Sequence, residues 1–166
     1  MPHAMPIPDP APIAFQLDGE NVEVAVDPLL PLGIAIREAL QRNALVLPCQ
    51  VGACGACTVL LDKAPVLACL TATGLVDGRR VTTIQGLPED DPVIAAFVDA
   101  SAFQCGYCTP GFVLATHALL AERRASGQDV DRGAIMAGLA GNLCRCASYP
   151  AIISAVEGLA EDLRRG

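Results

Sequence analysis

The eight cysteines constrain the fold of this 166-residue chain more than any other feature of its sequence. They form two groups of four, with the spacings C-x4-C-x2-C-x11-C and C-x2-C-x35-C-x1-C. The first group is Cys49, Cys54, Cys57 and Cys69, and the second is Cys105, Cys108, Cys144 and Cys146. Cysteines grouped in this way bind metal, carry out redox chemistry or form disulfides. We therefore expect a fold that brings each group together.

The amino-terminal residues bear on the choice between these uses of cysteine. Residues 1–12 contain five prolines, which predicts an extended arm, and they show neither a basic region followed by an apolar segment nor a twin-arginine pair. We therefore expect a cytoplasmic protein. In a reducing compartment clustered thiols hold metal or react, so four disulfides are the less favoured interpretation.

The first cysteine group has the spacing of a plant-type 2Fe-2S ferredoxin in its first three members, Cys49, Cys54 and Cys57. A loop of this length can wrap a small anionic cluster, and a fourth thiolate then comes from a separate strand. Gly52 and Gly55 allow the backbone turns that bring amide groups toward the sulfurs. A four-cysteine zinc site is the alternative, but zinc knuckles usually have C-x-x-C pairs, and the first pair here is wider.

The second cysteine group is not diagnostic by its spacing alone. Each of its two pairs precedes a predicted helix that contains an early proline, Pro110 or Pro150. The positive ends of two helices would then face one anionic cluster. This arrangement suggests a second cluster held between two helical turns.

Periodicity and turn residues predict an α+β protein in two parts. Strands are expected around the Asp18-Gly19 turn, around a turn at residues 62–65 and near residues 81–84, with an amphipathic helix over residues 32–40 between them. Four helices are expected after residue 86, opening at Asp91, Thr109, Asp131 and Pro150, with Gly141-Asn142 as the stop of the third. We place the domains at 13–88 and 89–166, after the arm at 1–12.

Composition excludes several classes of function. The chain carries a net charge of −7 without a long basic run, which excludes nucleic-acid binding. Its apolar runs are too short to span a membrane.

The sequence also lacks the motifs of a catalytic site. It has no P-loop, no dinucleotide glycine signature and no paired nucleophile and base, so we expect no catalysis by this chain alone. We expect His117 to be a core or interface residue. The 52% hydrophobic content instead suggests that a partner covers part of the surface.

The motifs CGACTV, CGYCTPG and GNLCRC, in this order, resemble the iron–sulfur subunit of the xanthine dehydrogenase and aldehyde oxidoreductase family of molybdenum hydroxylases. The resemblance covers roughly residues 13 to 164. It implies an N-terminal β-grasp 2Fe-2S ferredoxin-like domain and a C-terminal four-helix bundle that holds a second 2Fe-2S cluster. It also implies that Gln104 and Cys146 lie against the pterin of a partner subunit. The chain departs from the family at two places. The segment RNALVLPC leads to Cys49, where the family often has a glycine-rich segment, and Ala147, Ser148 and Tyr149 stand where Thr-Gly-Tyr is frequent.

The resemblance further implies a role as an electron-transfer subunit. Electrons would pass from a molybdopterin-binding large subunit, which oxidises an aldehyde, a purine or an N-heterocycle, through the second cluster and then the first. They would leave to FAD or to the haem of a cytochrome on another partner. The alternatives are a free two-cluster ferredoxin that shuttles between separate partners and a structural metal protein.

Overall fold

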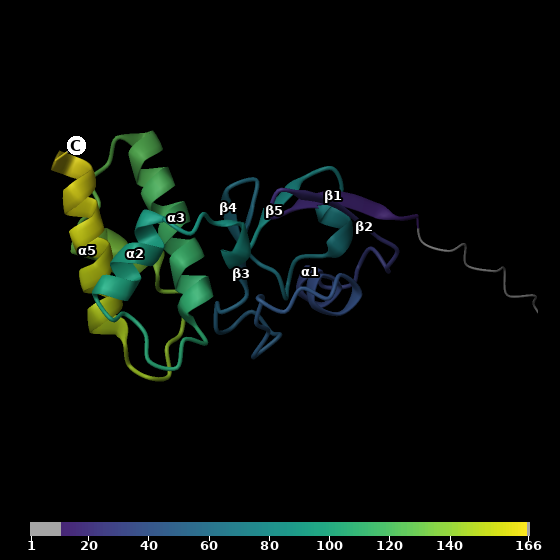
Figure 1. Ribbon diagram of the computed structural model, residues 1–166, viewed down its shortest axis with the longest axis horizontal. Helices are drawn as coiled ribbons and strands as arrows, with labels where there is room; N and C mark the ends of the chain where they lie inside the picture. The colour runs from purple at the N-terminus through teal and green to yellow at the C-terminus, as the bar shows by residue number, and fades with distance from the viewer. Residues whose placement is uncertain (1–10, 166) are drawn as a thin grey trace, which may run out of the picture.

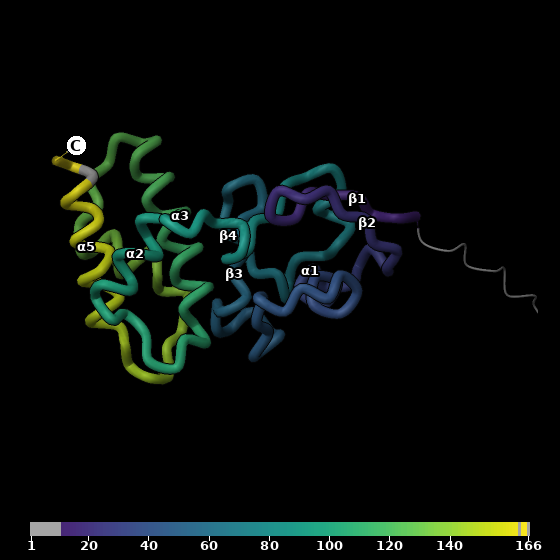
Figure 2. Tube along the Cα trace, viewed as in Figure 1, coloured from purple at the N-terminus to yellow at the C-terminus, as the bar shows by residue number. Residues whose placement is uncertain are grey.

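The computed structural model describes residues 11–165, apart from the side chain of Leu163, and places a sheet beside a group of helices (Figures 1 and 2). Most of the predicted arm at 1–12 lies outside the described residues. The sheet has five strands in the order β2-β1-β5-β3-β4. Their bounds are Ile13–Leu17 for β1, Glu20–Val24 for β2, Thr58–Leu61 for β3, Ala64–Leu67 for β4 and Arg80–Thr82 for β5. β1 and β5 are parallel and the other pairs are antiparallel, so the sheet is mixed.

Two tight turns connect the hairpins of the sheet. Asp18 and Gly19 have φ of 51° and 87°, which confirms the predicted hairpin turn. Asp62 and Lys63 have φ of 48° and 74°, so the second turn takes only two residues, and the predicted turn at 62–65 was too long. Residues 64–65 belong to β4, which tolerates Pro65 because it is an edge strand whose proline need not donate to a neighbour.

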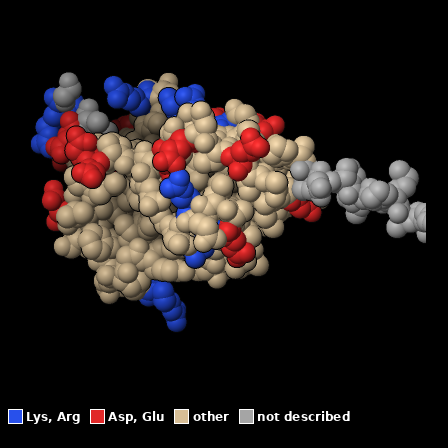
Figure 3. All heavy atoms as spheres, turned by 45° about the vertical axis from the view of Figure 1, so that its right-hand side comes forward, with Lys and Arg blue, Asp and Glu red and all other residues tan. Residues whose placement is uncertain are grey.

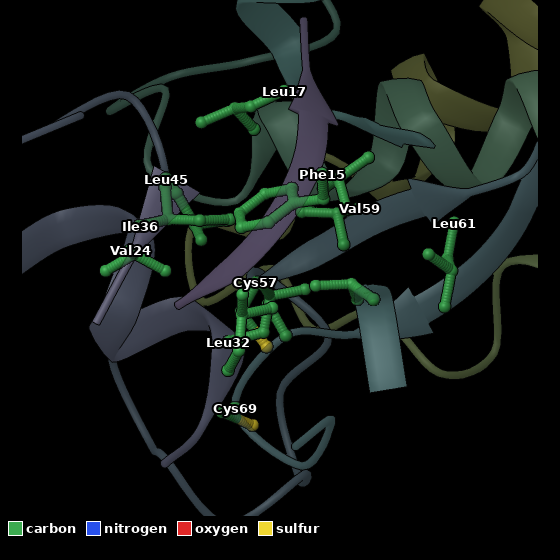
Figure 4. Packing of buried hydrophobic residues seen from close by; sticks show 14 residues of the cluster. Phe15, Leu17, Val24, Leu32, Ile36, Leu45, Cys57, Val59, Leu61 and Cys69 are labelled. Carbon is green, nitrogen blue, oxygen red and sulfur yellow. The ribbon is translucent and has the colours of Figure 1, made fainter. Parts of the chain in front are cut away.

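A short helical segment packs on the sheet. α1 spans Leu32–Ile34 and continues directly into the π-helical turn η1, Ala35–Ala39. Leu32 and Ile36 are fully buried and contribute to the same core as Phe15 and Val59 (Figure 4). The predicted helix over 32–40 is therefore present, with a π-turn in place of regular α-helix. Two 3-10 turns, η2 (Thr73–Val76) and η3 (Ile84–Gly86), complete this part, and η3 takes Ile84 out of the strand predicted near 81–84.

Four helices follow, as the sequence predicted: α2 (Pro92–Asp99), α3 (Thr109–Ser126), α4 (Arg132–Gly138) and α5 (Tyr149–Arg165). They share a second core built on large side chains such as Phe97, Phe112 and Ile135. The side chain of Asp91 accepts hydrogen bonds from the Val93 and Ile94 N–H groups, which confirms it as the cap of α2. The α+β class is thereby confirmed.

Two predicted helix boundaries need correction. The residue that precedes α3 is Cys108, and Thr109 already lies inside the helix, where its hydroxyl is buried without a hydrogen-bond partner. α4 ends at Gly138 with Leu139 as its cap, before the predicted stop at Gly141-Asn142. Asn142 lies beyond the helix and makes a contact elsewhere, described below.

Helix α3 joins the two parts of the structure (Figure 1). It packs along β3 and β4, and a small apolar cluster of Leu60, Leu114 and Ala118 lies between α3 and β3. Each part otherwise has its own core, one within residues 13–81 and one within residues 93–156.

Candidate metal centres

The four cysteines of the first group are brought together around one loop. Cys49, Cys54 and Cys57 lie between η1 and β3, and Cys69 follows β4. Their sulfurs approach one another in two pairs, because the Cys54 thiol acts on the pKa of Cys49, and the Cys69 thiol acts on the pKa of Cys57. Cys57 and Cys69 lie at the border of the sheet core, where Figure 4 shows their side chains close to Leu32.

The second group also forms two pairs. Cys105 and Cys108 lie between α2 and α3, and the other two cysteines lie between α4 and α5. The Cys146 thiol donates to the Cys105 sulfur at 3.5 Å, and the thiols of Cys108 and Cys144 are close enough that each acts on the pKa of the other. The pairs thus join residues that are far apart in sequence.

All eight thiols are free, and they come together in twos. Within residues 11–165, no group of three or more His, Cys, Asp or Glu side chains is arranged to hold a single metal ion. A 2Fe-2S cluster needs two thiolates on each of two irons, so two neighbouring pairs of thiols supply the donor set that it requires. Both groups fit that requirement.

The backbone of the first loop turns its amide groups toward the sulfurs. Gln50, Gly52 and Gly55 all have positive φ, of 54°, 76° and 70°. The Val51 N–H, together with the Cys54 thiol, lowers the pKa of Cys49 to about 6. Such a ring of N–H groups stabilises negative charge on thiolates and on an anionic cluster.

The sulfurs differ in how deeply they are buried. Burial raises the pKa of Cys57 to about 11 and that of Cys108 to about 12, and it also raises the pKa of Cys54. Cys105 is exposed, and the Tyr107 N–H lowers the pKa of its thiol. Each group therefore has a sulfur that faces the interior and one that lies close to solvent.

Gln104, for which the resemblance implied a contact with the pterin of a partner, lies beside the second group. Its side-chain amide donates to the carbonyl oxygen of Cys146 at 2.9 Å, and the residue is exposed. A cavity of about 630 Å³ is lined by cysteines of both groups. Its lining includes Pro48, Cys54, Cys105, Cys108, Cys144 and Cys146.

A junction between the two cysteine loops was not predicted from the sequence. The Leu143 N–H donates to the carbonyl oxygen of Cys54 at 2.9 Å, and the buried Asn142 side chain donates to the carbonyl oxygen of Gly55, also at 2.9 Å. Gly111, in the first turn of α3, lies against the same carbonyl. The motif GNLCRC contains this asparagine, but its place after a predicted helix suggested a stop signal only.

Two other side chains near the site also take roles that the sequence did not reveal. The Tyr149 hydroxyl accepts a hydrogen bond from the Cys144 N–H at 2.9 Å, and its ring packs edge-on against Phe112. His117 lies 3.0 Å from the carboxylate of Asp91 and so connects α3 to the cap of α2, in keeping with the structural role expected for it. Among the described residues, no helix has the length and apolar character needed to cross a membrane.

The chain is similar to known proteins over nearly its whole length. A family model described as a [2Fe-2S] binding domain matches residues 83–157. A protein of Bacillus subtilis named as a probable xanthine dehydrogenase subunit is 37% identical over 90% of this chain and 86% of that protein. The aldehyde oxidoreductase iron–sulfur-binding subunit of Escherichia coli K12 is 33% identical over 99% of this chain and 78% of that protein.

The fold is also similar to that of a solved structure. In the crystal structure of quinoline 2-oxidoreductase from Pseudomonas putida 86, one chain matches with a TM-score of 0.82 and 32% identity, over 94% of this chain and 97% of that one. The relatives are small subunits of multi-subunit oxidoreductases, and the resemblance found in the cysteine motifs is confirmed. The chain belongs to the iron–sulfur subunits of the xanthine dehydrogenase and aldehyde oxidoreductase family of molybdenum hydroxylases.

Proposed function

We propose that the chain carries two 2Fe-2S clusters in two domains, a β-grasp ferredoxin-like domain at 13–88 and a four-helix bundle at 89–166. The first cluster would be held by Cys49, Cys54, Cys57 and Cys69, and the second by Cys105, Cys108, Cys144 and Cys146. One observation carries the proposal: the eight free thiols form four pairs, two in each group, without a pair that mixes the groups. The two separate cores support the same division.

In this proposal each iron of a cluster binds one of the observed pairs. Cys49 and Cys54 would bind one iron of the first cluster, and Cys57 and Cys69 the other. Cys105 with Cys146, and Cys108 with Cys144, would do the same in the second. A bound cluster supplies one-electron redox chemistry. The chain itself supplies the thiolates, the N–H groups that stabilise their charge and the apolar side chains that keep water away.

We further propose that the chain passes electrons from a molybdopterin-binding large subunit to FAD or to the haem of a cytochrome on another partner. Cys105 and Gln104 are exposed beside the second group, which suits an entry point from the large subunit and the pterin contact inferred for Gln104 and Cys146. Exposed apolar side chains surround this point, including Phe103, Tyr107 and Leu143. Figure 3 shows a broad area without charged side chains on the visible face, as expected of a surface that a partner covers.

The substrate would be an aldehyde, a purine or an N-heterocycle, as in the named relatives, and would bind to the large subunit. The cytoplasmic location predicted from the amino-terminal residues stays a prediction. A free two-cluster ferredoxin is the alternative function, but the exposed apolar side chains beside Cys105 favour a permanent partner.

The experiment is to purify the native complex without oxygen and to record EPR spectra after reduction with dithionite. We expect about four irons per copy of the chain and two distinct paramagnetic centres. Cys69→Ser should remove one centre and Cys144→Ser the other, so each variant is the control for its counterpart. A single centre in the unchanged protein, or zinc in place of iron, would disprove the two-cluster proposal. Elution of the native chain alone, near 17.2 kDa, would disprove the subunit role.

A further inference from the structure

Ser148 lies against a sulfur of the second group, at one of the positions where this chain departs from the Thr-Gly-Tyr that is frequent in the family. It is 7% exposed, and its backbone N–H donates to the Cys144 sulfur at 3.4 Å. Ala147, with φ of 63°, turns the chain so that Ser148 comes back over the cysteine four residues earlier. The side chain of Ser148 therefore starts from a backbone position that is fixed beside the sulfur.

The hydroxyl of Ser148 is buried and has no hydrogen-bond partner among the described residues. A serine directly before a helix usually accepts a hydrogen bond from an N–H group of the first turn. That bond is absent before α5, where the Ile152 N–H is satisfied by the backbone carbonyl of Ser148 at 3.0 Å. A buried hydroxyl without a partner lowers the stability of a protein, so an unused donor at this position calls for an acceptor.

The sulfur of Cys144 is a suitable acceptor. The Ser148 N–H already donates to it at 3.4 Å, and the cysteine itself is buried, so few other donors can reach this sulfur. The Ser148 hydroxyl belongs to the residue whose N–H is held on this sulfur, and it has no other partner among the described residues. A thiolate bound to iron carries more negative charge than a thiol and accepts hydrogen bonds more strongly.

We propose that the Ser148 hydroxyl donates a hydrogen bond to the Cys144 thiolate and raises the reduction potential of the second cluster. The inference rests on the proposed function, because it requires a cluster at the second group. Reduction adds one negative charge to the cluster, and a donor to one of its sulfurs stabilises the reduced form more than the oxidised form. A glycine at this position supplies no such donor. Ser148 would thus make the second cluster a better electron acceptor.

The test is a redox titration of both clusters in the purified complex, followed by EPR, for the unchanged protein and for Ser148→Ala. We expect the one-electron reduction equilibrium of the second cluster to become about tenfold less favourable, which corresponds to about 59 mV, while the first cluster keeps its potential. Ser148→Thr keeps a hydroxyl and should restore most of the potential. Ser154→Ala, at an exposed position of α5, should change neither cluster.

A second measurement separates a hydrogen bond from a packing effect. The measurement compares the proton hyperfine couplings of the reduced second cluster in H2O and after exchange into D2O. The unchanged protein should show a strongly coupled proton that disappears on exchange. This proton should be missing in Ser148→Ala and present in Ser154→Ala. Unchanged potential in Ser148→Ala, an equal shift of both clusters, or failure of this variant to assemble the second cluster would each overturn the inference. Absence of a second cluster from the unchanged protein would instead refute the proposed function itself.

Discussion

Replacing Gly111 by alanine should destabilise the protein, because this glycine lies where the two cysteine loops meet. An added Cβ atom would lie 2.5 Å from the Gly55 carbonyl oxygen and 3.0 Å from both the Ala56 Cα and the Asn142 Nδ2. Two of these three neighbours are backbone atoms and cannot rotate away. The first-group loop would have to move away from α3, and the bond from Asn142 to the Gly55 carbonyl would be stretched or lost.

The expected cost follows from three contributions. Forcing a methyl group into a packed site costs about 1–3 kcal/mol. Loss of the Asn142 hydrogen bond adds about 1 kcal/mol, because the Gly55 carbonyl keeps two other donors, the Thr58 N–H and hydroxyl. Replacing glycine by alanine within a helix returns about 0.5–1 kcal/mol. The free energy of unfolding should therefore fall by about 1–3 kcal/mol, which lowers Tm by about 3–10 °C in a chain of this size.

The assay is thermal unfolding of the holoprotein without oxygen, followed by circular dichroism and by the visible absorbance of the clusters. Gly158→Ala is a matched control, because it also lies within a long helix but is exposed, and an added Cβ would meet no atom within 4 Å. This control should be stabilised by about 0.5–1 kcal/mol. If Gly111→Ala unfolds at the same temperature as Gly158→Ala, or higher, the two loops are not in the close contact described here.

Two further predictions concern the cap of α2 and the cluster-free thiols. Asp91→Ala should lower the unfolding free energy by about 1–2 kcal/mol in the same assay, because two N–H groups and His117 lose their acceptor, whereas Asp91→Asn keeps a capping oxygen and should cost less. In cluster-free protein, iodoacetamide should label Cys49 at a rate that rises through about pH 6, because its lowered pKa makes it a thiolate above that pH. Cys108, with a pKa of about 12, should stay unlabelled at about pH 7.5 when peptides are analysed by mass spectrometry, and equal labelling would contradict the burial described for it.

Local signals were sufficient to predict most elements of the fold. Asp18-Gly19 produced the expected hairpin because both residues accept positive φ, and Asp91 and Asp131 cap helices as predicted because their carboxylates bind free N–H groups. The errors occurred where tertiary contacts decide. Asp62-Lys63 forms a two-residue turn without glycine, and the position of Pro65 in an edge strand depends on strand order, which spacing does not reveal.

The candidate sites show the same division. Cysteine spacing was sufficient to predict two groups of four, but it could not show which thiols pair, because Cys105 and Cys146 are far apart in sequence and meet only through the packing of α2 to α5. The junction at Asn142 was missed for a similar reason. Its partner, the Gly55 carbonyl, lies in the other part of the structure, and a backbone acceptor leaves no pattern in a sequence.

The junction also determines how the two cysteine groups are placed relative to each other. Each group is built on its own core, so neither core alone fixes the separation between the groups. The hydrogen bond from Leu143 to Cys54 joins the residue next to Cys144 directly to a cysteine of the first group, and Asn142 holds the neighbouring carbonyl. In the proposed function the chain relays electrons between two clusters, and this requires a constant separation between them. The two hydrogen bonds and the close contact of Gly111 with the Gly55 carbonyl hold the two cysteine loops at a fixed separation. The small apolar cluster between α3 and β3 holds the two parts of the structure together as well.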